Sequence, residues 1–417
     1  MNNGGYSSLS GTSMATPQGF SRSLPLTSYS DFAQIAGIVA LILSARGKNF
    51  TGLTMRSRLA TATKLLNRVN SPSLDSAVHQ GGGLIDAFCA VWTNTTMSTS
   101  SLVLNDSVSF QGNQEFTISN NGTRNVSYIL THRQAVTLET FSAATKYNRP
   151  DIQPTSSNQS ASAQIIPQSF VLPPGSSQVV KVNFIPPQSL NPKSLAVYSG
   201  FIVMTSDADC ESHNLPYYGV AGSLKAQPII DRGPNENSTA NYPYLTYKKE
   251  KASQGGKNST NATVSEQPAL NTTFVWDLKK HNTTVLHFRT LCKATFSTLD
   301  FAIVGSPLLR LDVMPGNAVL SNVTNSKDYE KSFMGSRLLG LIPDSDSVSF
   351  QRSTAGDSFM SPWNATVVTK EKEKPHFLHN GSYKVLFRAL RVTGRKTNEA
   401  DYDYWVSPEF NLTNSRG

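Results

Sequence analysis

The stretch Ser10-Gly11-Thr12-Ser13-Met14-Ala15-Thr16-Pro17 decides how the whole chain is interpreted. A proline at its end suits the first turn of a helix, where the missing N–H costs little. A serine at a helix start lies near free backbone N–H groups and the positive end of the helix dipole, which favour negative charge on a nearby oxygen. Gly11 allows another backbone to approach closely. These features suit a nucleophilic serine at Ser13, and they suit equally a serine that only caps the helix.

The same stretch resembles the serine motif of the subtilisin-like serine protease (subtilase) family, GTSMAxP, in which the nucleophile corresponds to Ser13. The family motif continues into a helix that is similar to Ile35–Leu41 (IAGIVAL), and Gln80–Ala87 (QGGGLIDA) resembles the family's closing segment. The resemblance implies that residues 1–91 are the carboxy-terminal part of an α/β subtilase catalytic domain. It also implies hydrolysis of protein or peptide substrates through an acyl-enzyme on Ser13. The sequence indicates no cofactor and no metal site, and calcium dependence is left open.

The rest of the catalytic apparatus is missing from the chain. Subtilases supply aspartate, histidine and serine in that order, and Met1–Thr12 contains neither Asp nor His. The family's oxyanion asparagine also lies well upstream of the serine, and Asn2 and Asn3 are too close to take its place. No histidine is followed by glycine as the family requires, so we expect each of the seven to be an ordinary surface or turn residue. They are His79, His132, His213, His281, His287, His376 and His379. We therefore expect this chain to be an inactive fragment of a parent protease.

Residues 19–34 form a segment that the family motif does not contain. Its Pro25 and the polar run Thr27–Asp31 would interrupt the helix that follows Ser13. Removing the segment joins Gln18 to Ile35 and restores a continuous helix. We interpret its sixteen codons, which correspond to 48 nucleotides, as a translated fungal intron, with a genuine surface insertion as the alternative.

Apolar spacing in residues 1–91 predicts three helices, over Ile35–Ser44, Leu53–Asn67 and Leu84–Val91. The parallel sheet that such helices would cover in a subtilase lies upstream. We therefore expect residues 1–91 to be disordered or prone to aggregation in isolation, and the rest of the chain to fold independently.

From Trp92 onward apolar and polar residues alternate, which is typical of strands. The Asn120-Asn121-Gly122 turn between two such runs predicts a hairpin. Residues 92–225 resemble the fibronectin-III-like sandwich that follows the catalytic domain in large fungal subtilases and bacterial cell-envelope proteases. Tyr198–Ile202 and Leu215–Gly222 carry that resemblance.

Residues 226–270 are polar and predict a linker. Strand patterns return in residues 271–417, at 273–276, 284–288 and 383–387, and predict a second sandwich that resembles the ends of the same fungal proteins only loosely. Trp363 and Trp405 are interpreted as packing residues rather than as a ligand cage. The expected fold class is thus multidomain: the end of an α/β subtilisin-like domain followed by two all-β sandwiches.

Composition indicates a secreted or cell-surface glycoprotein. The chain carries fifteen Asn-x-Ser/Thr sequons, but no signal peptide, so we expect the true amino terminus to be missing. The net charge of +9 is scattered, which argues against nucleic-acid binding. The three cysteines do not suggest a framework of disulfide bonds. Cys89 is predicted to be a buried thiol, and a Cys210–Cys292 bridge is left open. Cell-wall or cell-surface association of the parent is also left open, and the alternative function is a non-catalytic extracellular binding module.

Overall fold

The computed structural model describes residues 30–141, 150–208, 210, 212–232, 243–250, 263–266, 274–277, 284–288, 304–321, 328–351, 359–369 and 373–413. The fold is mostly β-sheet, and its described residues form two compact units. The first unit contains the described residues from 30 to 223 except 150–152, and the second contains 150–152 and the described residues from 224 onward. Within these ranges, no helix is long and apolar enough to cross a bilayer.

The first unit begins with a helical segment, residues 30–92. Its helices are α2 (Ser30–Arg46), α3 (Gly52–Thr61), α4 (Ala77–Gln80) and α5 (Ala87–Trp92), and a small hairpin joins β1 (Thr63–Lys64) to β2 (Leu84–Ile85). Thr51 caps α3 by accepting a hydrogen bond from the Thr54 N–H, and Asp86 caps α5 in the same way through Cys89. The described part of this segment contains no parallel α/β sheet, so a subtilisin-like domain stays a prediction.

All three predicted helices have different bounds in the structure. The second ends at Thr61 instead of Asn67, because the chain turns into strand β1 and pairs there with β2. For the same reason, Leu84 and Ile85 are strand residues, and the third helix starts only after Asp86. The first helix starts at Ser30, so the last five residues of the 19–34 segment are helical.

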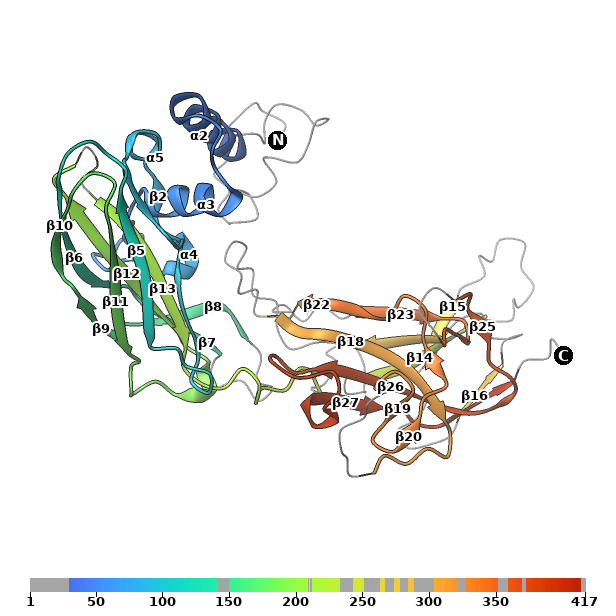
Figure 1. Ribbon diagram of the computed structural model, residues 1–417. Coiled ribbons are helices and arrows are strands. Elements are labelled where there is room, and N and C mark those ends of the chain that lie inside the picture. The colour runs from blue at the N-terminus through green and yellow to red at the C-terminus, as the bar shows by residue number, and fades with distance from the viewer. Residues whose placement is uncertain are drawn as a thin grey trace, which may run out of the picture. The chain divides into compact units, whose positions relative to one another are not determined.

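The first unit continues as a two-layered sandwich (Figure 1). One sheet has the strand order β10-β6-β12-β13-β4, with β7 and β8 attached, and the other has the order β3-β5-β11-β9. The strands are β3 (Thr95–Met97), β4 (Leu102–Asp106), β5 (Asn113–Asn120), β6 (Val126–Gln134), β7 (Thr137–Phe141), β8 (Pro150–Ser157), β9 (Ser162–Ile166), β10 (Ser169–Leu172), β11 (Ser177–Ile185), β12 (Val197–Ser206) and β13 (Ser212–Val220). Alternate apolar residues of both sheets meet in one buried core.

The Asn120-Asn121-Gly122 turn does not make the predicted hairpin. Strand β5 before it and strand β6 after it belong to different sheets, so the turn carries the chain across the sandwich. The Asn120 side-chain amide donates to the carbonyls of Arg124 (2.8 Å) and Leu172 (2.9 Å). Its backbone carbonyl accepts from the Gly175 N–H at 2.8 Å. Asn120 thus fixes two neighbouring crossovers.

The second unit is also built from β-sheet. One sheet has the order β15-β14-β17-β23, and a larger one has the order β16-β28-β26-β18-β21 with β22 and β27 attached. These strands are β14 (Tyr244–Glu250), β15 (Thr263–Glu266), β16 (Phe274–Asp277), β17 (Thr284–Phe288), β18 (Val304–Pro315), β21 (Gly340–Leu341), β22 (Ser347–Gln351), β23 (Phe359–Trp363), β26 (Gly381–Leu390), β27 (Tyr402–Val406) and β28 (Phe410–Thr413). Short hairpins join β19 (Ser332–Phe333) to β20 (Ser336–Arg337) and β24 (Thr366–Val367) to β25 (His376–Phe377).

Several predictions for this unit are confirmed. The runs at 273–276, 284–288 and 383–387 fall on β16, β17 and β26. Trp363 is buried beside Trp276 and Phe410, with its indole N–H donating to the Thr366 carbonyl, and Trp405 packs at the core's margin.

The range 226–270, predicted as a linker, differs from the expectation in two places. Ile229 and Ile230 are buried in the core of the second unit, and the Asp403 carboxylate accepts from their N–H groups at 2.8 and 2.9 Å. Strands β14 and β15 also lie inside this range and pair with each other. Polar composition conceals them, because few of their residues are large and apolar.

Candidate functional site

The predicted nucleophile, Ser13, lies outside the described residues, as does most of the 19–34 segment. The structure therefore does not test the geometry of a catalytic serine. The described region adjoining it in sequence is the helical segment. The site considered below is the surface where that segment meets strands β12 and β13, called the junction.

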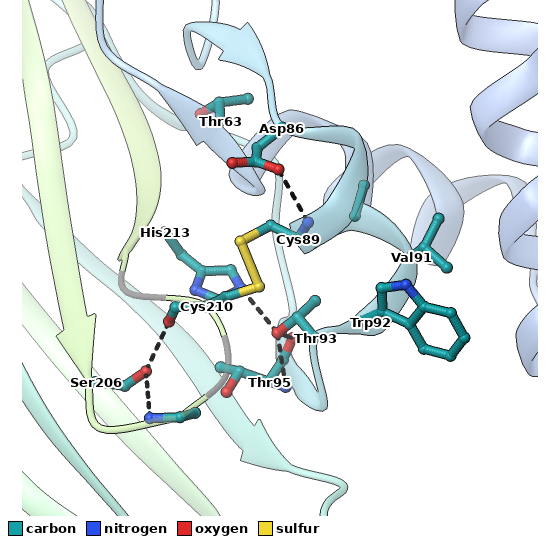
Figure 2. Close-up of a disulfide and its surroundings, with 12 residues drawn as sticks. Thr63, Asp86, Cys89, Val91, Trp92, Thr93, Thr95, Ser206, Cys210 and His213 are labelled. Carbon is teal, nitrogen blue, oxygen red and sulfur yellow. Dashed lines mark hydrogen bonds between the residues drawn. A yellow bond between two sulfur atoms is a disulfide. The ribbon is translucent and has the colours of Figure 1, made fainter.

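A disulfide between Cys89 and Cys210 crosses the junction (Figure 2). Cys89 lies on α5, and Cys210 lies just before β13. The prediction that Cys89 is a free thiol is wrong, and so is a bridge between Cys210 and Cys292. A pairing over 121 residues depends on tertiary structure, which local sequence does not encode. Cys292 lies outside the described residues.

Two arginines hold the carboxy-terminal end of α5. Arg58 on α3 is buried and donates to the carbonyls of Ala90 (2.5 Å), Val91 (3.1 Å) and Thr93 (2.6 Å). Arg46 on α2 donates to the Val91 carbonyl at 2.9 Å. Both positive charges face the negative end of the helix dipole, which is the favourable arrangement. Burial, and then the nearby charge of Arg46, lowers the pKa of Arg58 to about 10.

His213 is a buried residue of the junction rather than the surface or turn residue that we expected. Only 1% of it is exposed, and its Nε2 lies 3.0 Å from the Thr93 hydroxyl. Its Nδ1 has no hydrogen-bond partner among the described residues. Burial, followed by the charge of Arg58, lowers the pKa of His213 to about 4. The imidazole is therefore neutral near pH 7.

The two segments that carried the fibronectin-III-like resemblance lie side by side as β12 and β13. On β12, the Ser199 hydroxyl accepts from the Ala77 N–H at 3.0 Å and lies 3.0 Å from the Ser76 hydroxyl. Leu74 and Ala77 pack there with Phe201 and Val203, which extends the junction with apolar contact. On β13, the Asn214 side chain donates to the Thr63 carbonyl at 2.5 Å.

Glycines of the predicted closing segment are required by the geometry. A Cβ on Gly82 would lie 1.9 Å from the Ala60 carbonyl oxygen. Gly83 has a φ of +117°, and its Cβ would lie 2.4 Å from the Lys64 carbonyl oxygen. Both glycines thus let the β1–β2 hairpin close against α3.

Sequence reasoning overlooked most junction residues. Arg58 did give a signal, because it shares a helix face with Met55, Leu59 and Ala62 at the spacing i, i+3, i+4, i+7, where an apolar residue is expected. Cys210 and His213 gave none, because their partners are remote in sequence. No cluster of three or more potential metal ligands was found within the described residues.

A family model for the Fn3-like domain matches residues 103–218, the stretch from β4 to β13. Residues 103–218 form an Fn3-like domain. The predicted fibronectin-III-like sandwich is therefore confirmed, and the junction joins the Fn3-like domain to the helical segment. No match to this chain was found among curated proteins.

The solved structures that match this chain have low sequence identities and low TM-scores. A PapD-like domain of human CEP192 is 16% identical, with a TM-score of 0.22, and the match covers 32% of this chain and 88% of that one. The CsuC–CsuE chaperone–tip adhesion subunit complex of Acinetobacter baumannii is 7% identical, with a TM-score of 0.22, over 77% of this chain and 100% of that chain. The Pseudomonas aeruginosa CupB2 chaperone is 7% identical, with a TM-score of 0.21, over 75% of this chain and 99% of that one. Likeness at this level carries no functional argument.

Proposed function

We propose that this chain is the carboxy-terminal part of a subtilisin-like serine endopeptidase whose Fn3-like domain is fixed to the end of the catalytic domain. In the parent enzyme, Ser13 attacks the scissile carbonyl and forms an acyl-enzyme. The base and its orienting aspartate come from upstream of Ser13, as the family's chain order requires. The motif Ser10–Pro17 supports this role, and the Fn3-like domain is typical of subtilase carboxy-terminal regions.

The observation that carries the proposal is the character of α2. Its residues 35–43 are apolar around nearly the whole circumference, whereas only Ile38 and Ile42 are buried in the described contacts. Ile35 and Leu41 are 39% and 57% exposed. A helix that is apolar on all sides belongs in the interior of a larger domain. In the parent, we propose that the sheet of the catalytic domain covers the exposed apolar residues of α2, which follows the nucleophile in sequence.

The chain by itself lacks the groups for turnover. Two of the histidines are engaged elsewhere: His213 is buried against Thr93, and His132 lies 2.7 Å from the Tyr217 hydroxyl. In subtilisin, loss of the catalytic histidine lowers kcat by about 10⁶-fold. We therefore assign no useful peptidase activity to the isolated polypeptide.

The test compares this chain with a version extended by the coding sequence upstream of Met1. Both are incubated with casein and with a serine-directed fluorophosphonate probe. The extended version should cleave casein and label at Ser13, and Ser13→Ala should abolish both signals, whereas the present chain should do neither. Stop codons directly upstream, or an extended version that encodes no Asp-x-Gly and His-Gly-Thr motifs, would remove the proposal.

The second candidate is a non-catalytic extracellular module, which the Fn3-like domain favours because such a β-domain is compatible with binding. Ser13→Ala distinguishes the two functions in cells that produce the native gene. It should leave the function of a binding module intact and abolish that of a protease.

A further inference from the structure

One surface hollow of the first unit lies beside a sequon. The hollow measures about 610 Å³ and is lined by Ala45, Arg46, Phe88, Trp92 and Asn94. That volume falls within the ~300–1,000 Å³ range of small-molecule sites. Phe88 is 62% exposed and Trp92 is 48% exposed, although aromatic rings of this size are usually well covered. Figure 2 shows the Trp92 side chain directed away from the disulfide.

Asn94 begins the sequon Asn94-Thr95-Thr96, two residues after Trp92. The Arg46 guanidinium donates to Asn94 Oδ1 at 2.7 Å, which fixes the orientation of the side-chain amide. No hydrogen bond engages Asn94 Nδ2 in the part of the chain that the structure describes. The same guanidinium lies 5.9 Å from the centre of the Trp92 ring, so one side chain positions both the amide and the indole at the hollow.

We propose that Asn94 carries an N-linked glycan whose first sugar packs on Trp92 and Phe88 in this hollow. In the transfer step, the amide nitrogen Nδ2 displaces the diphosphate of a lipid-linked oligosaccharide from C1 of its first sugar. The C1–O bond breaks and a C1–N bond forms; the diphosphate leaves with the electron pair, and the nitrogen loses one proton. Oδ1 remains an acceptor for Arg46, so the product keeps the observed hydrogen bond. The C–H face of a pyranose then covers aromatic surface that is otherwise exposed to water.

The neighbouring sequon at Asn121 offers a contrast. Its Nδ2 donates to the Asn94 carbonyl at 3.2 Å and to the Thr96 hydroxyl at 3.0 Å. A glycan on Asn121 would displace one or both of these hydrogen bonds. Asn94 Nδ2 has no such conflict among the described residues, because it donates no hydrogen bond there. The site does not depend on the protease proposal, because it requires only passage through a glycosylating secretory route.

The experiment secretes the full chain from a eukaryotic host behind an added signal peptide. Enzymatic glycan release in ¹⁸O-water, followed by peptide mass mapping, should mark Asn94 as an ¹⁸O-labelled aspartate. Asn94→Gln should lower the thermal midpoint by about 2–4 °C, as expected for the loss of one aromatic contact. The same substitution in a Trp92→Ala background should have little effect. If Trp92→Ala is not secreted, Trp92→Leu serves as the second background.

Tryptophan fluorescence gives an independent readout. The chain has four tryptophans, of which Trp276 and Trp363 are buried, so acrylamide quenching reports largely on Trp92 and Trp405. Quenching should increase in Asn94→Gln and should stay low when an endoglycosidase trims the glycan to its first sugar. An unmodified Asn94 in the secreted chain overturns the proposal. Equal midpoint losses in both backgrounds, or quenching that Asn94→Gln leaves unchanged, overturn the packing of the sugar on Trp92.

Discussion

Replacing Cys210 with alanine removes the disulfide that crosses the junction. The bridge joins residues 121 positions apart, and loop-closure entropy for a loop of that length corresponds to about 5 kcal/mol at 25 °C, an upper value from which measured losses fall to about 2 kcal/mol. For a unit of this size, such a loss lowers the thermal midpoint by about 4–20 °C. The effect acts mainly on the unfolded chain, so the folded Fn3-like domain should keep its far-ultraviolet spectrum.

Calorimetry with and without reducing agent measures this effect. Cys210→Ala, Cys89→Ala and the reduced wild type should share one lowered transition of the first unit, and the double variant should be no worse than either single variant. Cys292→Ala is the matched control and should leave that transition in place. A wild-type midpoint that is insensitive to reduction, or the absence of a linked Cys89–Cys210 peptide in a non-reduced digest, would refute the assignment.

Changes at four further positions probe the helical segment and the junction. Arg58→Met removes three hydrogen bonds to carbonyls at the end of α5 and should lower the free energy of unfolding by about 2–4 kcal/mol, with Arg58→Lys recovering only part of it in urea titrations. Gly82→Ala should cost more than about 2 kcal/mol because of its clash with the Ala60 carbonyl. A Cβ added at Gly37, inside α2, would meet nothing within 4 Å, so Gly37→Ala should instead stabilise the protein by up to about 1 kcal/mol. Stability changes of the same sign at Gly37 and Gly82 would contradict the geometry. The pKa of His213 is about 4 in the folded chain, below the ordinary 6.5 of the unfolded chain. The neutral imidazole therefore contributes its full stabilisation above pH 6.5. As the pH falls towards 4, the free energy of unfolding decreases by up to about 3 kcal/mol. His213→Gln should flatten the stability profile over that window, and an unchanged profile would show that another group titrates there.

Alternation of apolar residues was enough to locate several of the strands. The runs on either side of the Asn120 turn fall on β5 and β6, and the predicted strand 284–288 has the bounds of β17. Alternation could not tell which strands pair. The turn at Asn120 satisfies the same local rules whether the next strand returns beside the first or crosses to the facing sheet. The choice depends on contacts such as the one between Asn120 and Leu172, which lie far apart in sequence.

The candidate site also contains residues that local sequence can indicate and residues that it cannot. Ser13 was predicted as a nucleophile from a short contiguous motif, and it lies outside the described residues, so it stays a prediction. The junction residues Cys210 and His213 act through partners on other elements, so their roles emerge only when the chain is folded. The spacing of Arg58 within α3 was the one local sign that a charge lies on a buried face.

The arginine and disulfide contacts hold the helical segment and the Fn3-like domain together as one folded unit. A chain cut between Val91 and Trp92 would leave Cys210 as a lone thiol, and the carbonyls that Arg58 binds would be divided between two fragments. Gene recombination between these two residues would therefore yield two poorly soluble fragments rather than two domains that fold on their own.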